Sequence, residues 1–197
     1  MDSLLDPFLR WMRCRKVRPH ISKGIVLCDI GCGIQTKLLR DLSGFIKEGI
    51  GLDKKITEYR FENLSFKTIL IDEHLPLSDK SVDVVTLLAV LEHLEKPVAT
   101  LAEVKRILKP GGTLLITVPT VPNQWVGEFL SYRLHLIDEN EYRDHKRYYS
   151  KRLLRENLAA AGFPLKGLTM YYFELGMNLF AKIRMGDAPV ERTARNG

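Results

Sequence analysis

The stretch VLCDIGCGIQTKLL, residues 26–39, changes character twice within a short distance. An apolar run ends at Asp29, glycines follow at 31 and 33, and apolar residues at helical spacing begin at Leu38. Glycines directly after a strand allow a tight turn in which the backbone comes close to a ligand and to the next helix. The stretch therefore predicts a strand–turn–helix unit that binds a nucleotide-like cofactor.

The order of the acid and the glycines narrows the choice of cofactor. A dinucleotide-binding turn needs G-x-G-x-x-G, which places a pyrophosphate on the N-terminus of the helix. Here Thr36 stands where the third glycine is required. Asp29 precedes the glycines, and its carboxylate disfavours a pyrophosphate but suits a cationic or hydroxyl-bearing ligand. The turn thus argues against a dinucleotide.

Outward from this turn, short apolar runs alternate with helical stretches. We expect strands over 24–30, 49–55, 66–72, 81–90 and 112–119, and helices over 35–47, 98–110 and 151–162. Ser150 is a good N-cap for the last of these helices, and residues 164–185 read as two strands with a turn near Gly176. The pattern predicts an α/β fold: a Rossmann-like doubly wound sheet, mostly parallel, with a C-terminal antiparallel hairpin strand.

The chain of 197 residues is long enough for one domain with a real core. We expect a single domain over 1–185, which begins with an amphipathic helix within 1–23. Residues 120–149 form a long connection rich in aromatic and charged side chains, which is typical of a lid or substrate wall. Residues 186–197 are polar without periodicity, so we expect a disordered tail.

Several blocks occur together in a characteristic order. DIGCGIQ at 29–35 is followed by Asp53 at the end of a strand, 20 residues after Gly33. LPLSDKSVDVVTLLAVLEHLEKP at 75–97, VKRILKPGGTLLITVP at 104–119 and DHKRYYSKRLLRENLAAAGF at 144–163 come next. Over residues 24 to 165 the chain resembles the class I S-adenosylmethionine-dependent methyltransferases, of the type that acts on small molecules and lipid precursors.

This resemblance implies S-adenosyl-L-methionine as the cofactor and assigns roles to particular residues. Asp53 would accept hydrogen bonds from both ribose hydroxyls, Asp72 would contact the adenine, and Leu88 and Ala89 would face the methionine end. Gln35 stands where the family often has a third glycine. The expected cofactor-binding residues are Asp29, Gly31, Cys32, Gly33, Gln35, Asp53, Lys54, Asp72, Glu73, Leu88 and Ala89.

Methyl transfer from a sulfonium is an in-line displacement, for which the enzyme mainly aligns the nucleophile and excludes water. A base is required only when the acceptor holds a proton that it does not lose readily. The candidate catalytic residues are His93, with Glu92 beside it, His145, and the two tyrosines Tyr148 and Tyr149.

The acceptor is harder to infer. The chain lacks the N-P-P-[YF] or D-P-P-Y tetrapeptide that amino methyltransferases of nucleic-acid bases tend to carry, and has LAVLEHL there instead. We expect a small or lipid-like, amphipathic acceptor and no clear nucleic-acid signature. Two alternatives stay open: a non-catalytic member of the fold that binds a partner, which Gln35 favours, and an NAD(P)-dependent oxidoreductase.

Composition and charge indicate which partners and which cell compartment to expect. A net charge of +6 is mild, and part of it lies in RWMRCRKVRPHISK at 10–23, which is most simply a solvated helix face but suits contact with an anionic membrane surface or nucleic acid. The start of the chain lacks the order of a signal peptide, and three cysteines form no even framework, so we expect a cytoplasmic protein. No CxxC pair or histidine-rich cluster suggests a metal.

Overall fold

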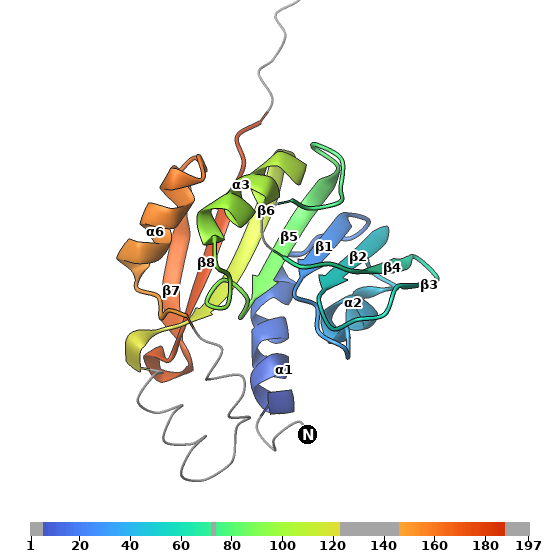
Figure 1. The fold of residues 1–197 in the computed structure, drawn as a ribbon, viewed down its shortest axis with the longest axis horizontal. Helices are drawn as coiled ribbons and strands as arrows, with labels where there is room; N and C mark the ends of the chain where they lie inside the picture. Colours follow the sequence, from blue (N-terminus) through green and yellow to red (C-terminus); the bar gives the residue numbers. More distant parts are fainter. Residues whose placement is uncertain (1–5, 72–73, 123–145, 188–197) are drawn as a thin grey trace, which may run out of the picture.

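The computed structural model describes residues 6–71, 74–122 and 146–187 (Figure 1). The helices are α1 (Asp6–Val17), η1 (Arg18–His20), α2 (Lys37–Leu42), α3 (Pro97–Ile107), α6 (Lys151–Ala160) and η2 (Glu174–Gly176). The strands are β1 (Val26–Ile30), β2 (Glu48–Asp53), β3 (Tyr59–Phe61), β4 (Leu64–Thr68), β5 (Val82–Leu88), β6 (Leu108–Pro119), β7 (Thr169–Phe173) and β8 (Asn178–Arg184).

The described strands form one sheet in the order β3-β4-β2-β1-β5-β6-β8-β7. Strands β4, β2, β1, β5 and β6 pair in parallel, whereas β3 and β8 are antiparallel to their neighbours β4 and β6. The chain moves outward from β1 in one direction to β2 and β4, and in the other to β5 and β6. The predicted doubly wound sheet with a C-terminal antiparallel hairpin is confirmed, and its switch point lies between β1 and β5.

The sheet separates two hydrophobic cores, because successive side chains of a strand point to opposite faces. On one face Cys28 and Ile30 of β1 join a cluster with residues of α3 and α6, such as Leu101 and Leu158. On the other face Leu27 joins a cluster with α1, α2 and Phe180 of β8. Figure 1 shows α3 at β6, α6 beside β7, and α2 near β2 and β4.

Local sequence signals explain where several elements begin and end. The hydroxyl of Ser150 accepts a hydrogen bond from the Leu153 backbone N–H at 3.1 Å, so the predicted cap of α6 is confirmed. The predicted hairpin is confirmed as well, since β7 and β8 pair antiparallel around η2, which ends at Gly176.

Some predicted boundaries are wrong. The third predicted strand, 66–72, lies instead at Leu64–Thr68, and the short strand β3 that pairs with it was not anticipated. Helix α3 ends at Ile107, before Pro110, because Leu108 already pairs with Val82 of β5. Helix α2 covers only six residues of the predicted 35–47.

Part of two predicted segments lies outside the described residues. This applies to 123–145 of the expected lid and to 188–197 of the expected tail. Over the described ranges, none of the helices combines the length and apolar character needed to cross a membrane.

Candidate functional site

The turn between β1 and α2 uses its two glycines for different purposes. Gly31 has φ +74°, and a Cβ atom added there would lie 2.3 Å from Cγ2 of Val90. Gly33 has φ +66°, but a Cβ there would meet no atom within 4 Å. Gly31 is therefore required for close packing against the segment after β5. Gly33 borders open space, where a ligand can approach the backbone.

Asp53, at the end of β2, holds this turn in place. Its Oδ2 accepts a hydrogen bond from the Gly33 N–H at 2.9 Å, and its Oδ1 accepts one from the Lys55 N–H at 2.8 Å. Its side chain is largely buried, with 9% of the residue surface exposed. A carboxylate offers about four acceptor positions, so Asp53 retains capacity for ligand hydroxyls. The structure thus brings together Gly33 and Asp53 as the sequence predicted, while their role toward a cofactor stays a prediction.

Asp29 lies buried at the same edge of the sheet. Its Oδ1 accepts a hydrogen bond from the Thr86 hydroxyl of β5 at 2.6 Å. Burial raises the pKa of Asp29 to about 7; the bond from Thr86 opposes this rise and the nearby charge of Asp53 adds to it. A buried acid with a pKa near neutrality ionises readily when a cation arrives, so Asp29 suits a positively charged ligand.

The other predicted cofactor residues differ in how they are placed. Cys32 is buried, and its thiol has a raised pKa because of burial, so it serves packing rather than nucleophilic chemistry. Gln35 and Lys54 are exposed in the loops after β1 and β2. Leu88 and Ala89 are half-buried where β5 ends, and Ala89 takes φ +56° while its N–H donates to the Thr117 carbonyl. Asp72 and Glu73 lie outside the described residues.

The predicted catalytic side chains are only partly described. His93 is half-buried in the turn after β5, and its backbone N–H donates to the Val90 carbonyl at 3.0 Å. Tyr148 is half-buried just before α6, and His145 lies outside the described residues.

Tyr149 is a core residue. Its side chain is fully buried, its hydroxyl lies 3.5 Å from the Leu91 carbonyl, and Asn157 donates to it at 3.3 Å. Burial raises the pKa of Tyr149 to about 12, so its hydroxyl keeps its proton at neutral pH.

Sequence reasoning missed two features of this edge. One is Thr86, a polar residue within the apolar run VDVVTLL, which reaches Asp29 only through strand pairing. The other is a polar cluster of Arg13, Glu174 and Asn178 beneath α1. The Asn178 amide donates to Glu174, and burial raises the pKa of Glu174 while the nearby charge of Arg13 lowers it. A buried asparagine at the start of an apolar strand was the available signal.

No group of three or more histidine, cysteine, aspartate or glutamate side chains that could hold a metal ion occurs in 6–71, 74–122 and 146–187.

Comparison with known proteins identifies relatives of this arrangement. Residues 8–166 match the protein family described as methyltransferase domain. A tRNA U34 carboxymethyltransferase of Desulfotalea psychrophila is 35% identical over 124 residues, which cover 58% of this chain and 38% of that protein. A demethylmenaquinone methyltransferase of Tropheryma whipplei is 27% identical over 142 residues, covering 69% of this chain and 57% of that protein. The matched region spans about two fifths to three fifths of these relatives.

The fold is shared with solved structures. An S-adenosylmethionine-dependent methyltransferase from Mesorhizobium loti superimposes with a TM-score of 0.65, at 15% identity, over 89% of this chain and 97% of that one. The architecture is thus that of the class I methyltransferase fold.

Proposed function

Because the chain belongs to the methyltransferase domain family, we propose that it binds S-adenosyl-L-methionine and transfers its methyl group to an acceptor. The observation that carries this proposal is the bond from the Gly33 N–H to Asp53, which aligns a carboxylate with the open side of a glycine turn at the switch point of the sheet. We further propose that 1–185 act as one domain, because α1 packs on the same sheet as α2.

The described residues fit the proposed cofactor. Gly33 leaves the backbone accessible, Asp53 offers acceptors for ribose hydroxyls, and Asp29 offers a buried carboxyl that a cation would ionise. The cofactor would supply a methyl group activated by a positively charged sulfur. The dinucleotide alternative lacks its third glycine, since Thr36 stands at the N-cap of α2 with φ +47°.

The protein's own contribution is alignment and exclusion of water. The carboxyl ends of β1, β2 and β5 meet at one edge, where the half-buried His93 follows β5. His93, His145 and Tyr148 remain candidates for a base where the acceptor needs one. The buried hydroxyl of Tyr149, with its pKa of about 12, is unsuited to that task.

Two classes of acceptor have support. The relative named demethylmenaquinone methyltransferase supports a small or amphipathic acceptor, as the sequence predicted. The relatives named tRNA U34 carboxymethyltransferase support an RNA acceptor, and the basic residues of α1 are a specific observation in favour of that candidate.

The proposal is tested by calorimetric titration with S-adenosylmethionine, S-adenosylhomocysteine and NADH in parallel. We expect micromolar binding of both sulfur compounds and none of NADH. Asp53→Ala should weaken this binding by about 1–3 kcal/mol, whereas Glu156→Ala, on the exposed side of α6, should leave it unchanged. A protein that binds neither sulfur compound would favour the non-catalytic alternative, and binding of NADH alone would favour the oxidoreductase.

A further inference from the structure

The outer side of α1 carries exposed aromatic rings next to arginines. Phe8 and Trp11 are 51% and 43% exposed, and their rings stack with centroids 5.9 Å apart. The guanidinium of Arg15 lies 5.2 Å from the centroid of the Trp11 ring. Residues at 8, 11, 15 and 18 recur at helical spacing, so Arg18 continues the same line. We call Phe8, Trp11, Arg15 and Arg18 the basic-aromatic face.

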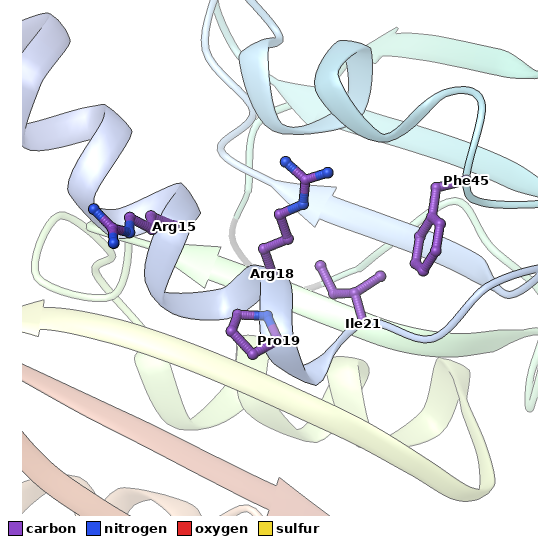
Figure 2. A pocket seen from close by; sticks show the side chains of 5 residues that line it. All are labelled: Arg15, Arg18, Pro19, Ile21 and Phe45. Carbon is purple, nitrogen blue, oxygen red and sulfur yellow. The ribbon is translucent and has the colours of Figure 1, made fainter.

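This face ends in a pocket. A cavity of about 510 Å³ is lined by Arg15, Arg18, Pro19, Ile21 and Phe45. Figure 2 shows Ile21 between Arg18 and Phe45, and Phe45 is 39% exposed. Its volume lies within the range of small-molecule pockets. The lining combines the guanidinium of Arg18 with the Phe45 ring and Pro19, whereas the guanidinium of Arg15 points away from Phe45 (Figure 2). A guanidinium together with an aromatic ring suits a ligand that is both anionic and planar, as a nucleotide is.

The charges of the segment 8–20 are all positive. The segment FLRWMRCRKVRPH at 8–20 contains no acidic residue. Arg13 and Lys16 face the protein. The charge of Arg13 lies near Glu174 and lowers its pKa, and the Lys16 ammonium lies 4.7 Å from the Tyr171 ring centroid. By contrast, neither Arg15 nor Arg18 forms an ion pair with any carboxylate of the described residues. Among the described residues, therefore, no carboxylate competes with an external anion for these two guanidinium groups.

The pocket is separate from the candidate cofactor turn. The Phe45 carbonyl accepts a hydrogen bond from the Gly24 N–H, just before β1 begins, whereas Gly31 and Gly33 follow the end of β1. Five residues of strand place these two ends about 16 Å apart. Helix α1 runs between the pocket and the edge that carries the turn. The charge of Arg13, in the middle of this helix, lowers the pKa of Glu174, which lies next to the carboxyl end of β7. A polymer lying along α1 would therefore reach from the pocket to the edge that carries the turn.

We propose that the basic-aromatic face and its pocket form a docking surface for single-stranded RNA. Phosphates lie on Arg15 and Arg18, a base stacks on the Trp11 and Phe8 rings, and one nucleotide enters the pocket. This inference rests on the proposed function, since it names RNA as the class of molecule brought to the methyl-transfer edge.

A membrane surface fits the same residues less well. An interfacial helix inserts a broad apolar face, but Cys14, Val17 and Ile21 of this segment are already buried against Leu27 and other core residues. The remaining exposed apolar groups are two stacked rings beside a concave pocket, a shape that suits bases better than a lipid surface.

Fluorescence anisotropy with a labelled oligouridine tests the proposal. The variant Arg15→Gln/Arg18→Gln should weaken binding roughly 10-fold and reduce the salt-dependence slope by about 1.4, or 0.7 for each phosphate that is no longer neutralised. Trp11→Ala should weaken binding by roughly 5-fold or more, because the base then has no indole ring to stack on. The matched control, Arg152→Gln/Arg155→Gln, removes the same charge from exposed positions on α6, packed on the opposite face of the sheet, and should bind as the wild type does.

Further measurements separate the possible outcomes. Equal weakening in both double variants would overturn the proposal, because net charge alone would then explain binding. If the protein sediments with phosphatidylglycerol vesicles and does not bind oligouridine, the RNA proposal is overturned in favour of a membrane surface. Titration with S-adenosylmethionine tests the proposed function separately, since Arg15 and Arg18 lie away from the turn and their variant should bind this compound normally.

Discussion

The buried acid Asp29 gives the protein a characteristic dependence of stability on pH. Its pKa is about 7 in the folded protein against 3.8 for the ordinary side chain. The folded state therefore holds this proton more tightly than the unfolded chain. The stability that the group contributes is fully present below about pH 4 and is lost as the pH rises toward about pH 7.

The substitution Asp29→Asn isolates this effect. The amide keeps the shape of the side chain, and its oxygen can still accept the hydrogen bond from Thr86. The difference between a pKa of 3.8 and one of about 7 corresponds to roughly 4 kcal/mol. The free energy of unfolding of the variant, relative to wild type, should thus rise by about 4 kcal/mol between about pH 4 and pH 7 and then level off. Any constant offset from the new amide does not alter this slope.

Urea unfolding followed by circular dichroism across this pH range measures the difference directly. Asp187→Asn serves as a control for the removal of one carboxylate, because the Asp187 side chain is 84% exposed. A difference between Asp29→Asn and wild type that stays constant with pH would refute the reasoning, since Asp29 would then titrate as an ordinary exposed acid.

Three further predictions concern packing and capping. Gly31→Ala should lower the free energy of unfolding by about 2–5 kcal/mol, because the clash with Val90 adds about 1–3 kcal/mol to the roughly 1–2 kcal/mol cost of its positive φ, whereas Gly33→Ala should bear only the φ cost of about 1–2 kcal/mol. Urea unfolding that ranks them the other way would contradict this. Tyr149→Phe should lower stability by about 0.5–1.5 kcal/mol and leave the pH profile of methyl transfer unchanged, and a shifted profile would restore it as a candidate base. Ser150→Ala should cost about 1 kcal/mol through loss of the α6 cap, measured by thermal unfolding.

Much of the fold can be predicted from the sequence because the residues that specify these elements are close together in the chain. The apolar run to Asp29, the glycines and the helix that follows are adjacent in the chain, so their order specifies the β1–α2 unit. Ser150 caps α6 through a bond to a residue three positions away. The hairpin of β7 and β8 is likewise a local structure.

Features that depend on distant residues were not predictable. Thr86 reaches Asp29 because β1 and β5 pair, although the two residues are 57 positions apart. The sequence places Tyr149 at the end of the expected lid over 120–149, yet the Tyr149 N–H donates to the Pro119 carbonyl and its ring is buried. Strand β3 is only three residues long, too short for a periodic pattern to reveal it. The pocket beside Arg18 and Phe45 likewise joins segments that the sequence does not connect.

We expect the glycine turn and Asp53 to bind the methyl donor. A crystal structure of the protein with S-adenosylhomocysteine tests this expectation most directly. We expect density for the ribose beside the Asp53 carboxylate, with the amino-acid end of the ligand near Gly31 and Asp29. Density for the ligand elsewhere, or an unliganded turn at saturating concentration, would contradict it.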